Sequence, residues 1–188
     1  MILQPNKKVV FIISQHNQGI GHFSRAAALA EALVKDFTVY HFSGGPAVPE
    51  LAPLPPVNFV QLPAFSRQEI KLGTLKKPLS KIFIERQKIL SDAFIKLNPA
   101  IIITELYPFA PHRLEDTLAS LLPVWRAAPN HPKIVCSLRD IPITSNSTTP
   151  LSDKAPKINQ NLCNFYDLVL YHSDPNVCSV EDVLGLAG

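Results

Sequence analysis

The first residues that could carry out chemistry form a turn, Gln15-His16-Asn17-Gln18-Gly19-Ile20-Gly21-His22, directly after an apolar run. Glycines let a backbone bend sharply and let a ligand approach it closely. A helix that starts after such a turn presents unpaired backbone amides to an anion. An imidazole exchanges protons near neutral pH. The turn could therefore bind an anion, move a proton, or serve only as a sharp turn in which His22 caps the helix.

Two familiar phosphate-binding motifs do not fit this turn. The dinucleotide fingerprint needs a third glycine, where this chain has Ser24, and an acidic residue about 20 positions further on. The next apolar run ends instead in Tyr40-His41-Phe42-Ser43. The phosphate loop of nucleotide hydrolases needs Gly-Lys-Ser or Gly-Lys-Thr after a longer spacer, and that pattern is missing. Neither ligand class is predicted by a standard motif here.

The elements that must position the turn alternate between strands and helices. Short apolar, β-branched runs predict strands at residues 8–14, 37–42, 57–62, 100–104, 133–138 and 168–171. Alanine content and apolar periodicity predict helices at 26–33, 79–97, 111–122 and up to about 165, with Pro123 as an interruption before Trp125 and residues 63–77 as a loop. This alternation predicts one α/β domain with a doubly wound parallel sheet in the order 3-2-1-4-5-6.

Polar residues follow the later strands at the points where each strand ends. Because the carboxyl ends of parallel strands meet at one edge of a sheet, the turn should lie beside these residues. The candidate ligand-binding residues on this edge are His16, Gly19, Gly21, Arg139, Asp140, His172 and Asp174, and Glu105 follows the fourth strand. Each has a structural explanation when taken singly, such as turn capping by Asp140 or an Arg139–Asp140 pair. Their common edge favours a binding site.

Basic residues gather in one stretch, residues 71–88. Lys71, Lys76, Lys77, Lys81, Arg86 and Lys88 alternate there with the apolar Leu72, Leu75, Ile82 and Phe83. The stretch is either a solvated helix face with its loop or a patch that rests on an anionic membrane surface. The overall charge of +3 is too weak to predict a nucleic-acid partner.

Composition and cysteine usage narrow the protein class. A chain of 188 residues with 46% hydrophobic content can bury the core of one domain. Three cysteines without metal-ligand spacing predict reduced thiols and no metal site. The sequence has no signal-peptide pattern and no apolar run of membrane-spanning length. We therefore expect a cytoplasmic protein, located at the inner face of the membrane if the basic stretch binds lipid.

Four segments resemble the amino-terminal half of the two-domain (GT-B) glycosyltransferases. They are Phe11-Ile12-Ile13 with Gly19-Ile20-Gly21-His22, Thr104-Glu105-Leu106-Tyr107-Pro108-Phe109, Cys136-Ser137-Leu138-Arg139-Asp140-Ile141, and Tyr166-Asp167-Leu168-Val169-Leu170 with the nearby Asp174-Pro175. They are most similar to predicted bacterial glycosyltransferases related to the peptidoglycan N-acetylglucosaminyltransferase family. The resemblance implies a Rossmann-like acceptor-binding domain at residues 1–175. Residues 176–188 would begin the connection to a donor-binding domain.

The resemblance also implies a reaction. Such enzymes transfer a sugar from a nucleotide sugar, which serves as co-substrate without a further cofactor, to an acceptor hydroxyl. By position, His22 would be the general base and Glu105 the carboxylate that orients it. Glu105 stands where relatives commonly have aspartate, and His16 is a rival base on the same turn.

The donor-binding half of such an enzyme has no counterpart in this sequence. The chain could be a fragment, a degenerate product, or one subunit that needs a separate donor-domain subunit. The sequence also leaves open a non-catalytic module that binds a phosphate-bearing or lipid-linked ligand at the Gly19 to His22 helix start.

Overall fold

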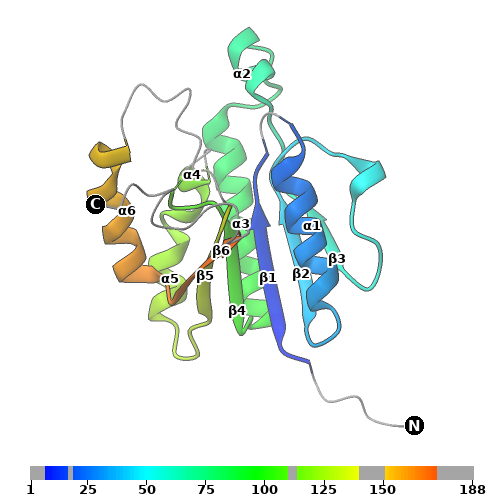
Figure 1. Ribbon diagram of the computed structural model, residues 1–188. Coiled ribbons are helices and arrows are strands. Elements are labelled where there is room, and N and C mark those ends of the chain that lie inside the picture. The colour runs from blue at the N-terminus through cyan, green and yellow to red at the C-terminus, as the bar shows by residue number, and fades with distance from the viewer. Residues whose placement is uncertain (1–6, 17–18, 110–113, 140–150, 173–188) are drawn as a thin grey trace.

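The computed structural model describes residues 7–16, 19–109, 114–139 and 151–172 of the chain (Figure 1). Its centre is a six-stranded sheet in the order β3-β2-β1-β4-β5-β6, with every neighbouring pair parallel. The strands are β1 (Val9–Ser14), β2 (Thr38–Ser43), β3 (Asn58–Gln61), β4 (Ile101–Glu105), β5 (Lys133–Arg139) and β6 (Leu168–His172). The predicted α/β class, doubly wound sheet and strand order are confirmed.

The helices connect these strands and pack on both faces of the sheet (Figure 1). They are α1 (Gly21–Leu33), α2 (Arg67–Leu72), α3 (Leu79–Leu97), α4 (Glu115–Leu118), α5 (Leu121–Ala127) and α6 (Leu151–Phe165), with one 3-10 turn, η1 (Pro49–Leu51). Helix α1 covers β1 and β2 on one face, whereas α3, α4 and α5 lie behind the sheet in this view.

Alternation along the strands builds two apolar layers. Phe11 and Ile13 of β1 pack in the layer that contains Leu90 of α3 and Trp125 of α5. Val10 and Ile12 point the other way, toward the alanines of α1. Successive strand residues face opposite sides of a sheet, so one apolar run supplies both layers. The small alanines let α1 lie close to the strands. Because α1 follows the end of β1 in the chain, its first residues lie at the carboxyl edge of the sheet.

Two expectations about local structure are corrected. The stretch predicted as a loop contains α2, because Ser66 and Glu69 form a reciprocal capping box at its start and Gly73 ends it with φ of 66°. The helix break precedes Pro123 rather than following it, since Pro123 lies in the first turn of α5, where no backbone N–H donor is needed. The predicted helix start at Pro111 and the boundary at residues 175–176 lie outside the described residues.

The Tyr166-Asp167 motif has a structural explanation at the amino end of the sheet. The Asp167 carboxylate accepts a hydrogen bond from the Ile134 backbone N–H at 2.9 Å and forms ion pairs with Arg126 and Lys133. These contacts join the start of β6 to the start of β5, which fixes the register of the edge strand. Within the described part of the chain, no helix is both long and apolar enough to cross a membrane.

Candidate functional site

The centre of the site is a contact between His22 and Glu105. Ile13 of β1 pairs with Thr104 of β4, so Glu105 lies beside the end of β1, from which the chain turns into α1. His22 Nδ1 lies 2.9 Å from Glu105 Oε1. A carboxylate only accepts hydrogen bonds, so Nδ1 carries the proton and Nε2 is the proton-accepting nitrogen of the neutral ring. The Glu105 side chain is 3% exposed and the His22 side chain 17% exposed, which leaves the base reachable while its partner is buried.

Arg25 is a third member of this cluster that sequence reasoning missed. Its Nη2 donates to the same oxygen, Glu105 Oε1, and its side chain is 23% exposed. Residues three apart in a helix lie on one face. That spacing from His22 was the available signal, but it required knowing that the face points to β4. With His22 neutral the cluster carries no net charge, and with His22 protonated it carries one positive charge.

The next two strands extend the polar edge. Ser137 of β5 pairs with Glu105 in the sheet register, and its Oγ lies 2.9 Å from His172 Nε2. Burial, and after it the positive charge of Arg25, lowers the pKa of His172 and favours its neutral form. Arg139 ends β5 opposite His172 in the register. The structure thus places His172 and the backbone of Arg139 on the predicted edge, with Ser137 between His172 and Glu105.

The backbone directly after Glu105 is strained. Leu106 has φ of 60°, a left-handed value that non-glycine residues rarely adopt. Tyr107 N–H donates to the Glu105 carbonyl at 2.9 Å, the two-residue pattern of a γ-turn, and Leu106 N–H donates to Ser137 O at 2.9 Å. Such strain costs of order 1–3 kcal/mol and persists only where surrounding contacts enforce it. The carboxylate therefore leaves the sheet at an enforced turn.

The turn before α1 has only partly the form that its glycines predicted. Gly19 has φ of 68°, a conformation that suits glycine and bends the chain into α1. Gly21 is the first residue of α1, lacks such a φ, and has open space where a Cβ would stand. It lies next to His22 at the start of α1, and no described contact requires it to be glycine.

His16, the rival base, lies in a different environment. Its ring is buried against Gly45, where an added Cβ would stand 2.1 Å from Nδ1, and it packs edge-on to Phe23. Burial, and to a smaller extent the charge of His22, lowers its pKa. The burial of the His16 ring makes His22 the better placed of the two bases.

Arg86 is a further charged residue at this edge, although the sequence grouped it with the basic surface. It is fully buried, and its guanidinium donates to Pro63 O at 2.7 Å, to Gln15 Oε1 at 2.8 Å and to Gly44 O. It also lies over the Phe65 ring, 4.7 Å from its centroid. Burial lowers its pKa to about 10, so it remains charged at neutral pH. Arg86 joins α3 to the β1–β3 half of the edge and does not belong to the basic surface.

Two predicted site residues, Asp140 and Asp174, lie outside the described residues, as does the side chain of Arg139. Among the residues that are described, no group of three or more His, Cys, Asp or Glu side chains is placed to hold a metal ion.

Comparison with known proteins gave matches only among solved structures, since no protein-family model and no curated protein matches the chain. TcCGT1, solved in complex with UDP, is 19% identical, with coverage of 69% of this chain and 28% of that chain and a TM-score of 0.42. Phytolacca americana UGT2, complexed with UDP-2fluoro-glucose and pterostilbene, is 14% identical, with coverage of 85% and 36% and a TM-score of 0.48. The apo form of Phytolacca americana UGT2 is 15% identical, with coverage of 82% of this chain and 33% of that chain and a TM-score of 0.45. The chain spans about a third of the length of these proteins. Likeness at this level does not assign an activity.

Proposed function

We propose that this chain is the acceptor side of a glycosyltransferase, in which His22 is the general base for an acceptor hydroxyl. Glu105 orients the His22 ring and stabilises its protonated form. The observation that carries the proposal is the 2.9 Å contact between His22 Nδ1 and Glu105 Oε1 at the carboxyl edge of the sheet. The glycosyltransferase class rests on the four sequence segments, two of which supply these residues. The narrower resemblance to the peptidoglycan-related group remains a prediction.

The arrangement suits base catalysis in three respects. The Glu105 bond fixes the ring and its tautomer, so Nε2 is held ready to accept a proton. The buried carboxylate stabilises the imidazolium that forms. Arg25 pairs with the same carboxylate oxygen and so offsets part of that stabilisation. The longer side chain of Glu105, compared with aspartate, reaches the base at normal hydrogen-bond length.

The proposed step balances without a metal or a redox partner. The acceptor oxygen forms a bond to the anomeric carbon of the sugar, and the bond from that carbon to the nucleoside diphosphate breaks. The acceptor proton moves to His22 Nε2. The groups that bind the nucleotide sugar would belong to a donor-binding domain, either covalently attached or supplied as a separate subunit.

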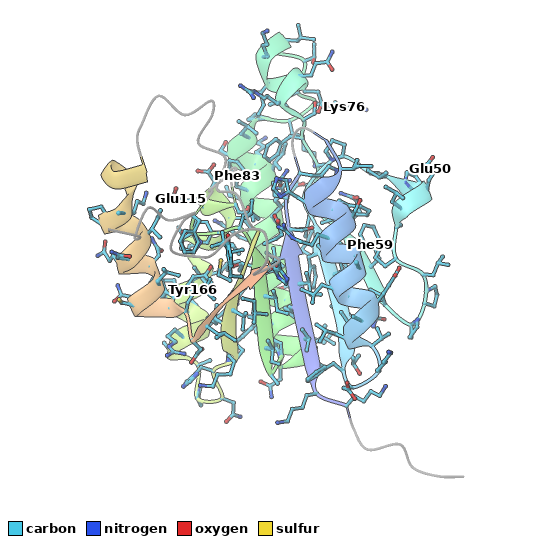
Figure 2. All side chains as sticks on the ribbon, in the orientation of Figure 1. Glu50, Phe59, Lys76, Phe83, Glu115 and Tyr166 are labelled. Atoms are coloured by element: carbon cyan, nitrogen blue, oxygen red, sulfur yellow. The ribbon has the colours of Figure 1, made fainter. Side chains whose placement is uncertain are left out.

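A membrane-bound acceptor is the partner that the surface near α2 supports. Figure 2 shows Lys76 at the part of the molecule that projects beyond the carboxyl edge. Leu72 at the end of α2 and Ile84 in the second turn of α3 are both 63% exposed, and Lys71 and Lys81 are exposed as well. Exposed apolar side chains among lysines suit an anionic lipid surface. Such a surface would bring a lipid-linked acceptor to the same edge as His22.

The test is acceptor-dependent release of nucleoside diphosphate from a panel of nucleotide sugars, with the chain supplied together with its donor-binding domain. His22→Ala should abolish most turnover, whereas His131→Ala, an exposed histidine just before β5, should leave it unchanged. Equal turnover by the His22 variant would contradict the proposal, as would the absence of turnover with every donor.

The alternative is a binding module for a phosphate-bearing ligand at the start of α1. One observation weighs against it: Arg25, a described cation one turn into that helix, is already paired with Glu105. The module predicts saturable binding of inorganic phosphate or a phospholipid headgroup without turnover, and binding that survives Glu105→Gln.

A further inference from the structure

The strained turn after Glu105 is held from the opposite face of the sheet. Thr104 precedes Glu105 in β4, so its side chain points to the α3–α6 side while that of Glu105 points to the α1 side. Thr104 Oγ1 donates to Tyr107 O at 2.9 Å, and it lies 2.9 Å from the Tyr166 hydroxyl. Figure 2 shows Tyr166 beside α6, just before β6 begins.

The direction of both hydrogen bonds follows from a count of protons. A threonine hydroxyl has one hydrogen, and Thr104 gives it to the Tyr107 carbonyl. Tyr166 must therefore donate to Thr104. Burial raises the pKa of Tyr166 well above its ordinary value, which keeps the phenol protonated and able to donate. The result is a hydrogen-bond relay that runs from Tyr166 through Thr104 to the backbone carbonyl of Tyr107.

We propose that Tyr166 and Thr104 are positioning residues for Glu105, which hold the γ-turn at Leu106 and thereby aim the carboxylate at His22. The proposal rests on the proposed function for its catalytic consequence. Its structural part is that the Tyr166–Thr104–Tyr107 hydrogen-bond relay sets the His22–Glu105 contact, and this part stands on geometry alone.

Two features distinguish this hydrogen-bond relay from ordinary core packing. The Tyr107 carbonyl that Thr104 binds belongs to the residue whose N–H closes the turn on Glu105. Both ends of that residue's backbone are thus fixed, one by Glu105 and one by Thr104. Leu106, with its positive φ, lies between Glu105 and Tyr107, so these contacts hold the turn in a strained conformation. Loss of the hydrogen bonds from Tyr166 to Thr104 and from Thr104 to Tyr107 would let the turn relax and Glu105 move.

The experiment compares variants that keep or remove single hydroxyls. Tyr166→Phe and Thr104→Val remove one hydroxyl each, and Thr104→Ser restores the donor. Tyr40→Phe is the matched control, because Tyr40 is also a partly buried tyrosine packed on the same apolar layer. We expect Tyr166→Phe and Thr104→Val to lower kcat about tenfold with little change in KM, and Thr104→Ser and Tyr40→Phe to stay near wild type.

Two readouts separate a positioning role from a general loss of stability. In a Glu105→Gln background, Tyr166→Phe should cause no further loss of kcat, because the carboxylate it positions is gone. The second readout is independent of activity and uses the NMR resonance of the His22 Nδ1 proton. In Tyr166→Phe and Thr104→Val this resonance should move toward its position in the Glu105→Gln variant. In Tyr40→Phe it should stay at its wild-type position.

The outcomes distinguish the two proposals. If His22→Ala and Glu105→Gln leave turnover unchanged, the proposed function fails, while the NMR comparison still decides the positioning role. If those variants lose turnover but Tyr166→Phe shows additive losses, or leaves the His22 resonance unmoved, the positioning role is overturned.

Discussion

Two charged clusters lie at the same edge of one sheet, and they differ in what surrounds the charge. Arg86, on the β1–β3 side, is fully buried and donates to three protein oxygens. Glu105, on the β4–β6 side, shares one oxygen between His22 and Arg25, both of which keep exposed surface. The Arg86 cluster is closed by protein groups, whereas the Glu105 cluster presents a base to whatever approaches. The comparison separates a charge that is enclosed by the fold from a charged cluster that a ligand could still reach.

The largest expected effect concerns the closed cluster. Arg86→Met should lower the free energy of unfolding by about 3–5 kcal/mol, because it removes the donor of three hydrogen bonds, two of them buried. Urea denaturation measures this change. Lys88→Met on the same helix, which removes only an exposed pair with Asp92, should change stability by less than about 0.5 kcal/mol. A loss below 1 kcal/mol for Arg86→Met would remove the distinction between the clusters.

The second effect concerns stability in acid on the β1–β3 side of the sheet, the closed half that contains the Arg86 cluster. Burial, and then the charge of His16, lowers the pKa of His41 to about 4. The unfolded chain therefore binds this proton first, so stability is present above pH 6.5 and falls as the pH drops from there to about 4. The loss is about 3 kcal/mol by linkage. His41→Phe, which keeps an aromatic ring beside Phe23 and Phe59, should flatten this slope; an unchanged slope would assign it to other groups.

Glycines in the two halves should respond oppositely to alanine. Gly45→Ala should lower the free energy of unfolding by about 1–3 kcal/mol, because the new Cβ meets the buried His16 ring. Gly21→Ala should raise it by up to about 1 kcal/mol, since nothing lies near and alanine favours the helix. Thermal unfolding of both variants gives the comparison. Equal losses would show that the start of α1 is as tightly packed as the closed half.

The smallest expected effect concerns the surface around α2. Sedimentation with anionic vesicles at low salt should exceed that with neutral vesicles, and salt should release the protein, since each basic residue contributes about 1 kcal/mol. Lys71→Glu with Lys76→Glu should weaken it, and Lys96→Glu at the far end of α3 should not. Equal sedimentation with both vesicle types would leave a solvated surface as the explanation.

The sequence predicted the sheet well because each strand is a local signal. Runs such as Val9–Ser14 and Ile101–Glu105 are apolar on both faces, and only covered parallel strands need that. Helix α3 was equally clear from its apolar stripe. The capping residues Ser66 and Glu69 of α2 can be read in the sequence, but the short helix that they start, Arg67–Leu72, carries no apolar stripe and was predicted as a loop.

The site was predictable only in part, because its contacts join residues distant in sequence. His22 and Glu105 could be paired through the resemblance and through the rule for strand ends. Arg25 and Ser137 could not, because their roles depend on how α1 is rotated over β4 and on the register between β4 and β5. Arg86 was misplaced for a similar reason, since helical periodicity does not show whether a stripe-edge arginine is buried.

The central claim is that His22 and Glu105 act as one unit, and a double-mutant cycle on turnover tests it most directly. His22→Ala should lower turnover by about 10²–10⁴-fold, roughly 3–5 kcal/mol of barrier. Glu105→Gln should cost less, because the base remains. The double variant should be little worse than His22→Ala alone, because the carboxylate has no role without the imidazole. Additive losses in the double variant, or an active His22→Ala protein, would contradict this account.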